Sequence, residues 1–247
     1  MSANVLEKAP SSSGVATRER LIVALDVSTA KEARDLVARI GDSAGLYKVG
    51  LQLFTAEGPN LVRELVNSGR RVFLDLKLHD IPNTVGHAVR SAVGLGASML
   101  TVHAGAGSDV LRAATEAAEG RVAILGVTVL TSFSDEDLRE TGVPTDVAEQ
   151  VAHLAALAQS CGCAGVVTSP RETALMRKLL GPKMYIVNPG IRPQGSSQDD
   201  QERTATPAAA ILAGASHIVV GRPITRAEDP ARAAANIVQE MEQVHRS

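Results

Sequence analysis

The strongest constraint on the fold is a two-part unit that recurs along the chain from about residue 20 onward. Each unit begins with a short run rich in Val, Ile and Leu, and then apolar residues return at helical spacing. The apolar runs are continuous rather than alternating, which is typical of parallel strands covered on both faces. Strands are therefore expected at 21–26, 46–51, 71–78, 98–103, 122–130, 165–168, 184–188 and 217–221.

Helical patterns fill the intervals between these strands. They lie at 29–40, 59–67, 82–95, 108–119, 145–160, 171–180, 206–212 and 230–244. The first is well marked at its start, because Thr29 and Glu32 have the spacing of a capping box. Eight strand–helix units in about 230 residues predict a single α/β domain, a (β/α)8 TIM barrel. A doubly wound sheet with fewer strands is the alternative.

No linker or change in composition divides the chain after its start. Residues 1–19 are polar and rich in Ser, and we expect a disordered N-terminal extension there, with the barrel domain spanning 20–247. This extension lacks the apolar core of a secretory signal, and no apolar run reaches the roughly 18 residues of a membrane span. Cys161 and Cys163 are separated by one residue and are expected to be small, buried thiols, in keeping with a reducing cytoplasm.

Composition excludes some classes of partner. The formal net charge is −2, which argues against a general nucleic-acid or anionic-membrane binder. The chain has three Phe, two Tyr and no Trp, so a base-stacking platform for single strands is not expected.

Charged side chains occur in strands that should otherwise be apolar. Asp26 ends the first strand, Lys48 lies in the second, and Asp75 and Lys77 lie in the third. Residues two apart on a strand share a face, so Asp75 and Lys77 should point together into the barrel while the leucines beside them face the helices. Lys48 should extend this pair into a row. Charges at the carboxyl ends of barrel strands are typical of catalytic sites.

Two other readings of these charges remain open. Asp26, Asp75 and His103 have ligand types that suit a divalent ion, but Lys48 and Lys77 would place two ammonium groups against it, so no metal is expected. Alternatively, Asp75 and Lys77 could form a purely structural ion pair, and His103 could be an ordinary core histidine.

The last strands indicate an anion site. Gly221-Arg222 follows the eighth strand and Pro189-Gly190-Ile191-Arg192 follows the seventh, where barrels often bind phosphate. Glycine lets backbone N–H groups approach an anion, and arginine offers a bidentate fork. Two long segments, 131–145 and 188–207, follow strands 5 and 7, and the second has the composition of a mobile lid that includes Gln201.

These residues form motifs that resemble one known family. The run Asp75-Leu-Lys77-Leu-His-Asp80-Ile-Pro82-Asn-Thr84 is similar to the signature of the orotidine 5′-phosphate decarboxylases. The supporting motifs are Leu25-Asp26, Tyr47-Lys48-Val49-Gly50, Val102-His103, Leu130-Thr131-Ser132, Pro189-Gly190-Ile191-Arg192 and Val220-Gly221-Arg222. They occur in the family's order over about residues 20 to 245. The flanking set makes the match specific, because the D-x-K-x-x-D core is shared with relatives.

The resemblance implies a cofactor-free decarboxylase of a nucleotide monophosphate, with a barrel that forms a homodimer through its catalytic face. Lys48, Asp75 and Lys77 match the family's charged tetrad, with Lys77 as the proton donor to C6 of the pyrimidine. The fourth member, Asp80, would enter the active site of the partner subunit, with Thr84 beside it.

Further positions are implied to bind the substrate. Asp26 matches the ribose-contacting aspartate of the family. The positions that bind the rest of the nucleotide are Thr131, Arg192, Gln201, Gly221 and Arg222. The lid lacks the Tyr with which some members hold the phosphate, so that contact would depend on Gln201 and Arg222.

Two alternative functions follow from the same motifs. Magnesium-dependent relatives that act on keto-sugar phosphates share the barrel and the D-x-K-x-x-D core, but they need an acid on the second strand where this chain has Lys48. A non-catalytic, nucleotide-sensing barrel is the other alternative, and its best sign would be the loss of Lys77, which is present.

Overall fold

The apolar runs pair in chain order and close into a barrel. In the computed structural model, which describes residues 16–193 and 204–244, eight parallel strands each pair with the next, and the last pairs with the first. The strands are β1 (Leu21–Ala24), β2 (Leu46–Gly50), β3 (Arg71–Leu78), β4 (Met99–His103), β5 (Ala123–Val127), β6 (Gly165–Val167), β7 (Tyr185–Asn188) and β8 (His217–Val220). The predicted (β/α)8 barrel is confirmed, and the doubly wound alternative is wrong.

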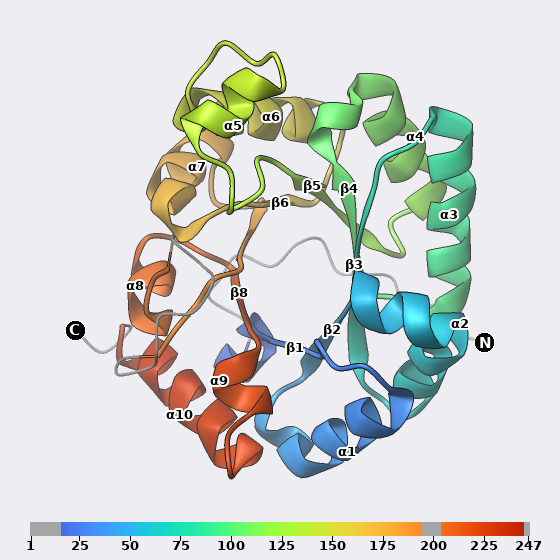
Figure 1. Ribbon diagram of the computed structural model, residues 1–247, viewed down its shortest axis with the longest axis vertical. Helices are drawn as coiled ribbons and strands as arrows, with labels where there is room; N and C mark the ends of the chain where they lie inside the picture. The colour runs from blue at the N-terminus through green and yellow to red at the C-terminus, as the bar shows by residue number, and fades with distance from the viewer. Residues whose placement is uncertain (1–15, 194–203, 245–247) are drawn as a thin grey trace.

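Helices surround the strands in chain order, from blue α1 to red α10 (Figure 1). They are α1 (Ala30–Ile40), α2 (Leu51–Asn67), α3 (Pro82–Leu95), α4 (Ser108–Ala118), α5 (Asp135–Glu140), α6 (Val147–Ser160), α7 (Thr173–Leu180), α8 (Pro207–Leu212), α9 (Arg222–Thr225) and α10 (Pro230–Gln243). The capping box predicted at the start of α1 is present, because Thr29 accepts from the Glu32 N–H and Glu32 accepts from the Thr29 N–H.

The core consists of two apolar layers, one inside the barrel and one between strands and helices. The inner layer takes its side chains from seven of the strands, at Ile22, Ala24, Leu46, Phe73, Met99, Leu125, Val187 and Val219. The outer layer contains Leu74, and Leu76 and Leu78 pack against it, as predicted from the alternation in β3. The inner layer fills the barrel, so that the charged residues farther along the strands lie above it at the mouth.

Several elements differ from the sequence-based expectation. Helix α2 begins at Leu51 rather than Pro59, with Gly58 at a φ of 66° between its two parts. The segment 131–145 contains α5, which a capping box between Ser134 and Asp137 starts. Arg222 opens the short helix α9. Residues 17–19 were assigned to the extension, but with Arg20 they form a 3₁₀ helix, Thr17–Arg20. Residues 1–15 lie outside the described residues.

The two cysteines are buried, as predicted. Cys161 caps the end of α6 and Cys163 precedes β6, and both are buried free thiols. Burial raises the pKa of the Cys163 thiol to about 12. Among residues 16–193 and 204–244, no helix has the length and apolar character needed to cross a membrane.

A buried histidine lies at the opposite end of the barrel from the charged row. His217 begins β8, its Nδ1 lies 3.1 Å from the Ser216 Oγ, and its ring meets Tyr185 edge-on. Burial, with further contributions from Arg71 and Arg20, lowers the pKa of His217 to about 3. His217 is therefore neutral in the folded protein at neutral pH.

This histidine should make the protein sensitive to acid. Between about pH 6.5 and pH 3 the unfolded chain binds a proton at His217 that the folded chain does not, so stability falls as pH falls. Over this range His217 lowers the free energy of unfolding by about 1.4 kcal/mol for each unit by which the pH falls. Urea unfolding at pH 6.5 and pH 4.5 measures this effect. The free energy of unfolding should fall less between the two pH values in His217→Gln than in the wild type. His153→Gln, at an exposed position in α6, is the control, and equal slopes for His217→Gln and wild type would contradict the expectation.

Candidate active site

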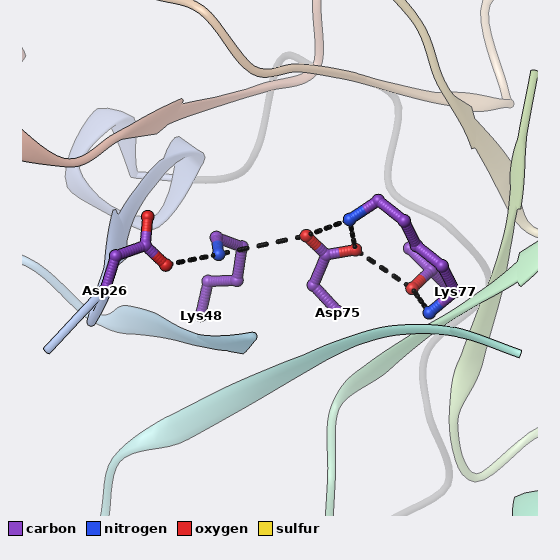
Figure 2. A network of polar contacts seen from close by, with 5 residues as sticks. Asp26, Lys48, Asp75 and Lys77 are labelled. Carbon is purple, nitrogen blue, oxygen red and sulfur yellow. Dashed lines mark hydrogen bonds and ion pairs between the residues drawn. The ribbon is translucent and has the colours of Figure 1, made fainter. Parts of the chain in front are cut away.

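Four charged side chains of alternating sign form a row at the mouth of the barrel (Figure 2). The Lys48 Nζ lies 2.9 Å from the Asp26 Oδ1 and 3.8 Å from the Asp75 Oδ2. The Lys77 Nζ lies 2.8 Å from both carboxylate oxygens of Asp75. The row comes from the carboxyl ends of β1, β2 and β3, because parallel strands bring those ends to one rim. The sequence predicted this row.

The middle of the row is shielded from water and its ends are open. The side chains of Lys48 and Asp75 are 11% and 14% exposed, while that of Lys77 is 30% exposed. Partial burial strengthens the attraction between these charges, because less water screens them. Lys48 and Lys77 are both held by Asp75, which therefore orients two ammonium groups at once.

A glycine close to Lys48 leaves room for its ammonium in this position. Gly50 follows two residues later on β2, and a Cβ added there would lie 2.9 Å from the Lys48 Nζ. The absence of a side chain at Gly50 lets the ammonium sit between the carboxylates of Asp26 and Asp75. The Lys48 ammonium therefore occupies the position between these two carboxylates.

Lys77 sits at an irregularity of β3. Its φ is 48°, and the register between β3 and β4 shifts between Leu74 and Leu78. The Lys77 N–H donates to the Thr101 Oγ1 at 2.9 Å, and the Thr101 hydroxyl donates to the Asp75 Oδ1 at 3.0 Å. The alternation predicted that Asp75 and Lys77 share a face, but the bulge that brings the ammonium back onto Asp75 was not predicted.

A cavity of about 620 Å³ opens beside the row. Asp26, Lys48, Asp75 and Lys77 line it from the β1–β3 side. Residues that follow the later strands also line it, namely Thr131, Pro189, Gly190, Arg192, Gly221 and Arg222. The cavity has the volume of a small-molecule site and lies at the carboxyl ends of the strands, where barrel enzymes bind substrates.

The loop after β7 is held at its base. Ile191 bridges to Ala205, and the Arg192 N–H donates to the Ala205 carbonyl at 2.9 Å, so the two ends of the predicted lid run side by side. Arg192 and Arg222 follow the neighbouring strands β7 and β8, and both line the cavity. Because β8 pairs with β1, Arg222 comes from the strand next to the Asp26 end of the row. Gln201 lies outside the described residues.

Asp80 and Thr84 are not part of this cavity. Both are exposed, and the Asp80 Oδ1 accepts from the Ile81 N–H at 2.6 Å at the start of α3. Ile81 beside them is 66% exposed, which is unusual for so large an apolar side chain. The single chain therefore does not bring Asp80 or Thr84 to the other predicted site residues.

His103 lies close to the row, and its surroundings disfavour a positive charge on its ring. Its ring centroid is 5.4 Å from that of His79. Burial first, and then the charges of His79 and Lys77, lower the pKa of His103. Within residues 16–193 and 204–244, no group of three or more His, Cys, Asp or Glu side chains is arranged to hold a metal ion.

Some residues at the site were not predicted from the sequence. Thr101 contacts both Asp75 and Lys77, and Ser28, Glu32, Thr225 and Arg226 line the cavity. Thr101 had a weak signal, a polar residue two positions before His103 in an otherwise apolar strand. The other four residues follow the ends of β1 and β8, and nothing in the sequence except that position indicated that they would line the cavity.

The fold and the site define a (β/α)8-barrel protein with a cation-rich cavity at the carboxyl ends of its strands. Residues 19–237 match the family described as orotidine 5′-phosphate decarboxylase / HUMPS family. The chain therefore belongs to the orotidine 5′-phosphate decarboxylase / HUMPS family.

Individual relatives agree with this membership. The chain is 51% identical over 229 residues to an orotidine 5′-phosphate decarboxylase of Rhodopseudomonas palustris (strain HaA2), covering 92% of this chain and 97% of that protein. It is 49% identical over 236 residues to one of Moorella thermoacetica, covering 92% and 94%. The crystal structure of the Lactobacillus acidophilus enzyme aligns with a TM-score of 0.82 and 38% identity, over 90% of this chain and 99% of that chain.

Proposed function

We propose that the protein decarboxylates orotidine 5′-phosphate to uridine 5′-phosphate and CO2, the last step of de novo pyrimidine nucleotide synthesis. Family membership supports the substrate and the reaction. The observation that carries the proposal is the row Asp26–Lys48–Asp75–Lys77, which presents an oriented ammonium to the cavity. We further propose that the reaction needs no cofactor and that the chain's own side chains supply the chemistry.

The cavity suggests how the nucleotide lies. Arg222 and Arg192 offer guanidinium groups to the phosphate, and Gly221 leaves its backbone open to close approach. Thr131 also lines the cavity. Asp26, at the other end of the row from Lys77, is suited to accept hydrogen bonds from the ribose hydroxyls. The pyrimidine would then reach the Lys77 end of the row, with C6 and its carboxylate facing the Lys77 ammonium.

The chemical step has a specific electrostatic demand. When the bond between C6 and the carboxylate breaks, its electron pair stays on C6 in the plane of the ring, where the π-system cannot spread it. The Lys77 ammonium stabilises this charge and then donates a proton to C6, which forms the new C–H bond and leaves a neutral amine. Water returns a proton to Lys77 before the next turnover.

The carboxylates prepare Lys77 for that step. Asp75 holds the ammonium through both oxygens at 2.8 Å, so its orientation is set before the substrate binds. Lys48 offsets the charge of Asp75 from the other side. Asp75 also places a negative charge near the substrate carboxylate, and the repulsion favours departure of CO2.

A homodimer with shared active sites is part of the proposal. Asp80 and Thr84 are exposed outside the cavity, and the neighbouring Ile81 is 66% exposed. An interface over this surface would bury Ile81 and bring Asp80 of the partner subunit towards Lys48 and Lys77. Asp80 would then complete the charged tetrad, with Thr84 close to the nucleotide.

The magnesium-dependent relatives are the rival proposal. They need an acid on β2 to hold the ion, whereas here Lys48 occupies the place between two carboxylates. A non-catalytic, nucleotide-sensing barrel is also disfavoured, because it has no need of the Lys77 ammonium held on Asp75. Both rivals remain distinguishable by assay.

The decisive experiment follows the ultraviolet absorbance of orotidine 5′-phosphate with purified protein dialysed against EDTA. We expect turnover at the same rate before and after removal of divalent ions, since no step passes through a metal. Lys77→Ala runs beside the wild type to exclude a contaminating enzyme. Absence of turnover by folded wild-type protein, with or without magnesium, would refute the decarboxylase proposal. Turnover that required magnesium would refute the metal-free mechanism.

We also propose that the protein works in the cytoplasm. Cys161 and Cys163 are free thiols, and burial keeps them from oxidants. The raised pKa of Cys163, about 12, keeps that group a thiol rather than a reactive thiolate. Free, unreactive cysteines are typical of proteins in a reducing compartment.

A further inference from the structure

We propose that Thr101 is a positioning residue for the decarboxylation. Its hydroxyl fastens the Lys77 backbone and the Asp75 carboxylate to β4, and thereby aims the Lys77 ammonium at the reacting carbon. Thr101 does not line the cavity and acts through the other two residues. The inference rests on the proposed function, and its test separates the two.

The backbone at Lys77 requires a local cause. Among the described residues, only Lys77 and Glu119 are non-glycine residues with positive φ. Glu119 caps the end of α4, where a left-handed residue is common. Lys77 lies inside a strand, where a φ of 48° is strained and persists only if its surroundings enforce it.

Thr101 supplies that enforcement. The pairing of β3 with β4 is irregular between Leu74 and Leu78, so the Lys77 N–H does not find a regular ladder partner. It donates instead to the Thr101 Oγ1 at 2.9 Å. Thr101 is fully buried, and without its oxygen that N–H would lose its partner in a place that water does not readily reach.

The same hydroxyl also fixes the carboxylate. It donates to the Asp75 Oδ1 at 3.0 Å while accepting from the Lys77 N–H, and a hydroxyl can do both at once. Asp75 in turn holds the Lys77 Nζ at 2.8 Å. The three residues close a ring, from Lys77 backbone to Thr101 to Asp75 and back to the Lys77 ammonium.

This ring predicts an effect on the chemical step rather than on binding. The contacts suited to phosphate and ribose lie elsewhere in the cavity, at Arg222, Arg192 and Asp26. Loss of the Thr101 hydroxyl would let the ammonium drift relative to C6, and a displacement of about 1 Å at a reacting group can cost on the order of 100-fold in rate.

The test compares Thr101→Val, which keeps the shape and removes the hydroxyl, with Thr101→Ser, which keeps the hydroxyl. We expect Thr101→Val to lower kcat about 30-fold or more while KM and inhibition by the product uridine 5′-phosphate change less than about 3-fold. Thr101→Ser should recover most of kcat. Thr128→Val is the matched control, because Thr128 is a buried threonine whose hydroxyl donates to the Val167 carbonyl.

Several outcomes would overturn the proposal. These are a wild-type kcat in Thr101→Val, a loss in Thr101→Ser as large as in Thr101→Val, or a loss in Thr128→Val of the same size. Thr101→Ala is measured as well, because it shows whether a loss of activity in Thr101→Val comes from the methyl group that replaces the hydroxyl. If neither apolar variant folds while Thr101→Ser has wild-type stability and a reduced kcat, the positioning role is also rejected. Failure of the wild type itself to turn over the substrate would instead reject the proposed function.

Discussion

Replacement of Lys77 by alanine is expected to lower kcat/KM for orotidine 5′-phosphate by at least about 10⁴-fold. The variant loses the proton donor, which contributes about 10²–10⁴-fold, and the positive charge facing C6, which contributes about 10²–10³-fold. The barrel should remain folded, because Asp75 keeps Lys48 at 3.8 Å and the Thr101 hydroxyl at 3.0 Å. Progress curves and circular dichroism of the purified variant measure the two effects.

A matched control tests whether any lysine–aspartate pair would behave in this way. Lys31 contacts Asp35 at 2.8 Å on the exposed face of α1, and neither residue lines the cavity, so Lys31→Ala removes a pair of the same length from outside the site. Its kcat/KM should equal that of the wild type. Activity of folded Lys77→Ala within about 100-fold of wild type would remove Lys77 from the role of proton donor.

The Arg222→Ala variant is expected to raise KM about 100-fold with a smaller effect on kcat. A charge-assisted hydrogen bond contributes about 1.5–3 kcal/mol, and a guanidinium can offer two such bonds to one phosphate. Because the phosphate does not react, most of this binding energy should appear in KM. Steady-state kinetics over a wide range of substrate concentration measure the division between KM and kcat.

A substrate without the phosphate sharpens this test. For the nucleoside orotidine, wild type and Arg222→Ala should have equal kcat/KM, because orotidine has no phosphate for Arg222 to contact. Arg63→Ala, which removes an exposed guanidinium bonded to Asn60 in α2, is the control on both substrates. An unchanged KM for orotidine 5′-phosphate, or an equal loss on orotidine, would show that Arg222 does not bind the phosphate.

Much of the site was predictable because barrel topology converts sequence position into spatial position. Once eight strand–helix units are recognised, residues at the strand ends meet at one rim, and Asp26, Lys48 and Asp75 need no further information to be neighbours. Period-two alternation in β3 likewise separates Asp75 and Lys77 from the leucines. The helical spacing of apolar residues failed to predict the start of α2. The helix was expected at Pro59 but begins at Leu51 and continues past the non-helical Gly58.

What the sequence by itself determined is the order of the barrel and the identity of the charges at its mouth, because apolar periodicity and chain order carry both. Only the tertiary structure decided how Lys77 is held. Its positive φ, the register shift beside it and the contact with Thr101 depend on the pairing of β3 with β4, two segments separated along the chain by α3. A hydrogen bond between strands depends on their register to within an ångström, and no periodicity of one strand contains that distance.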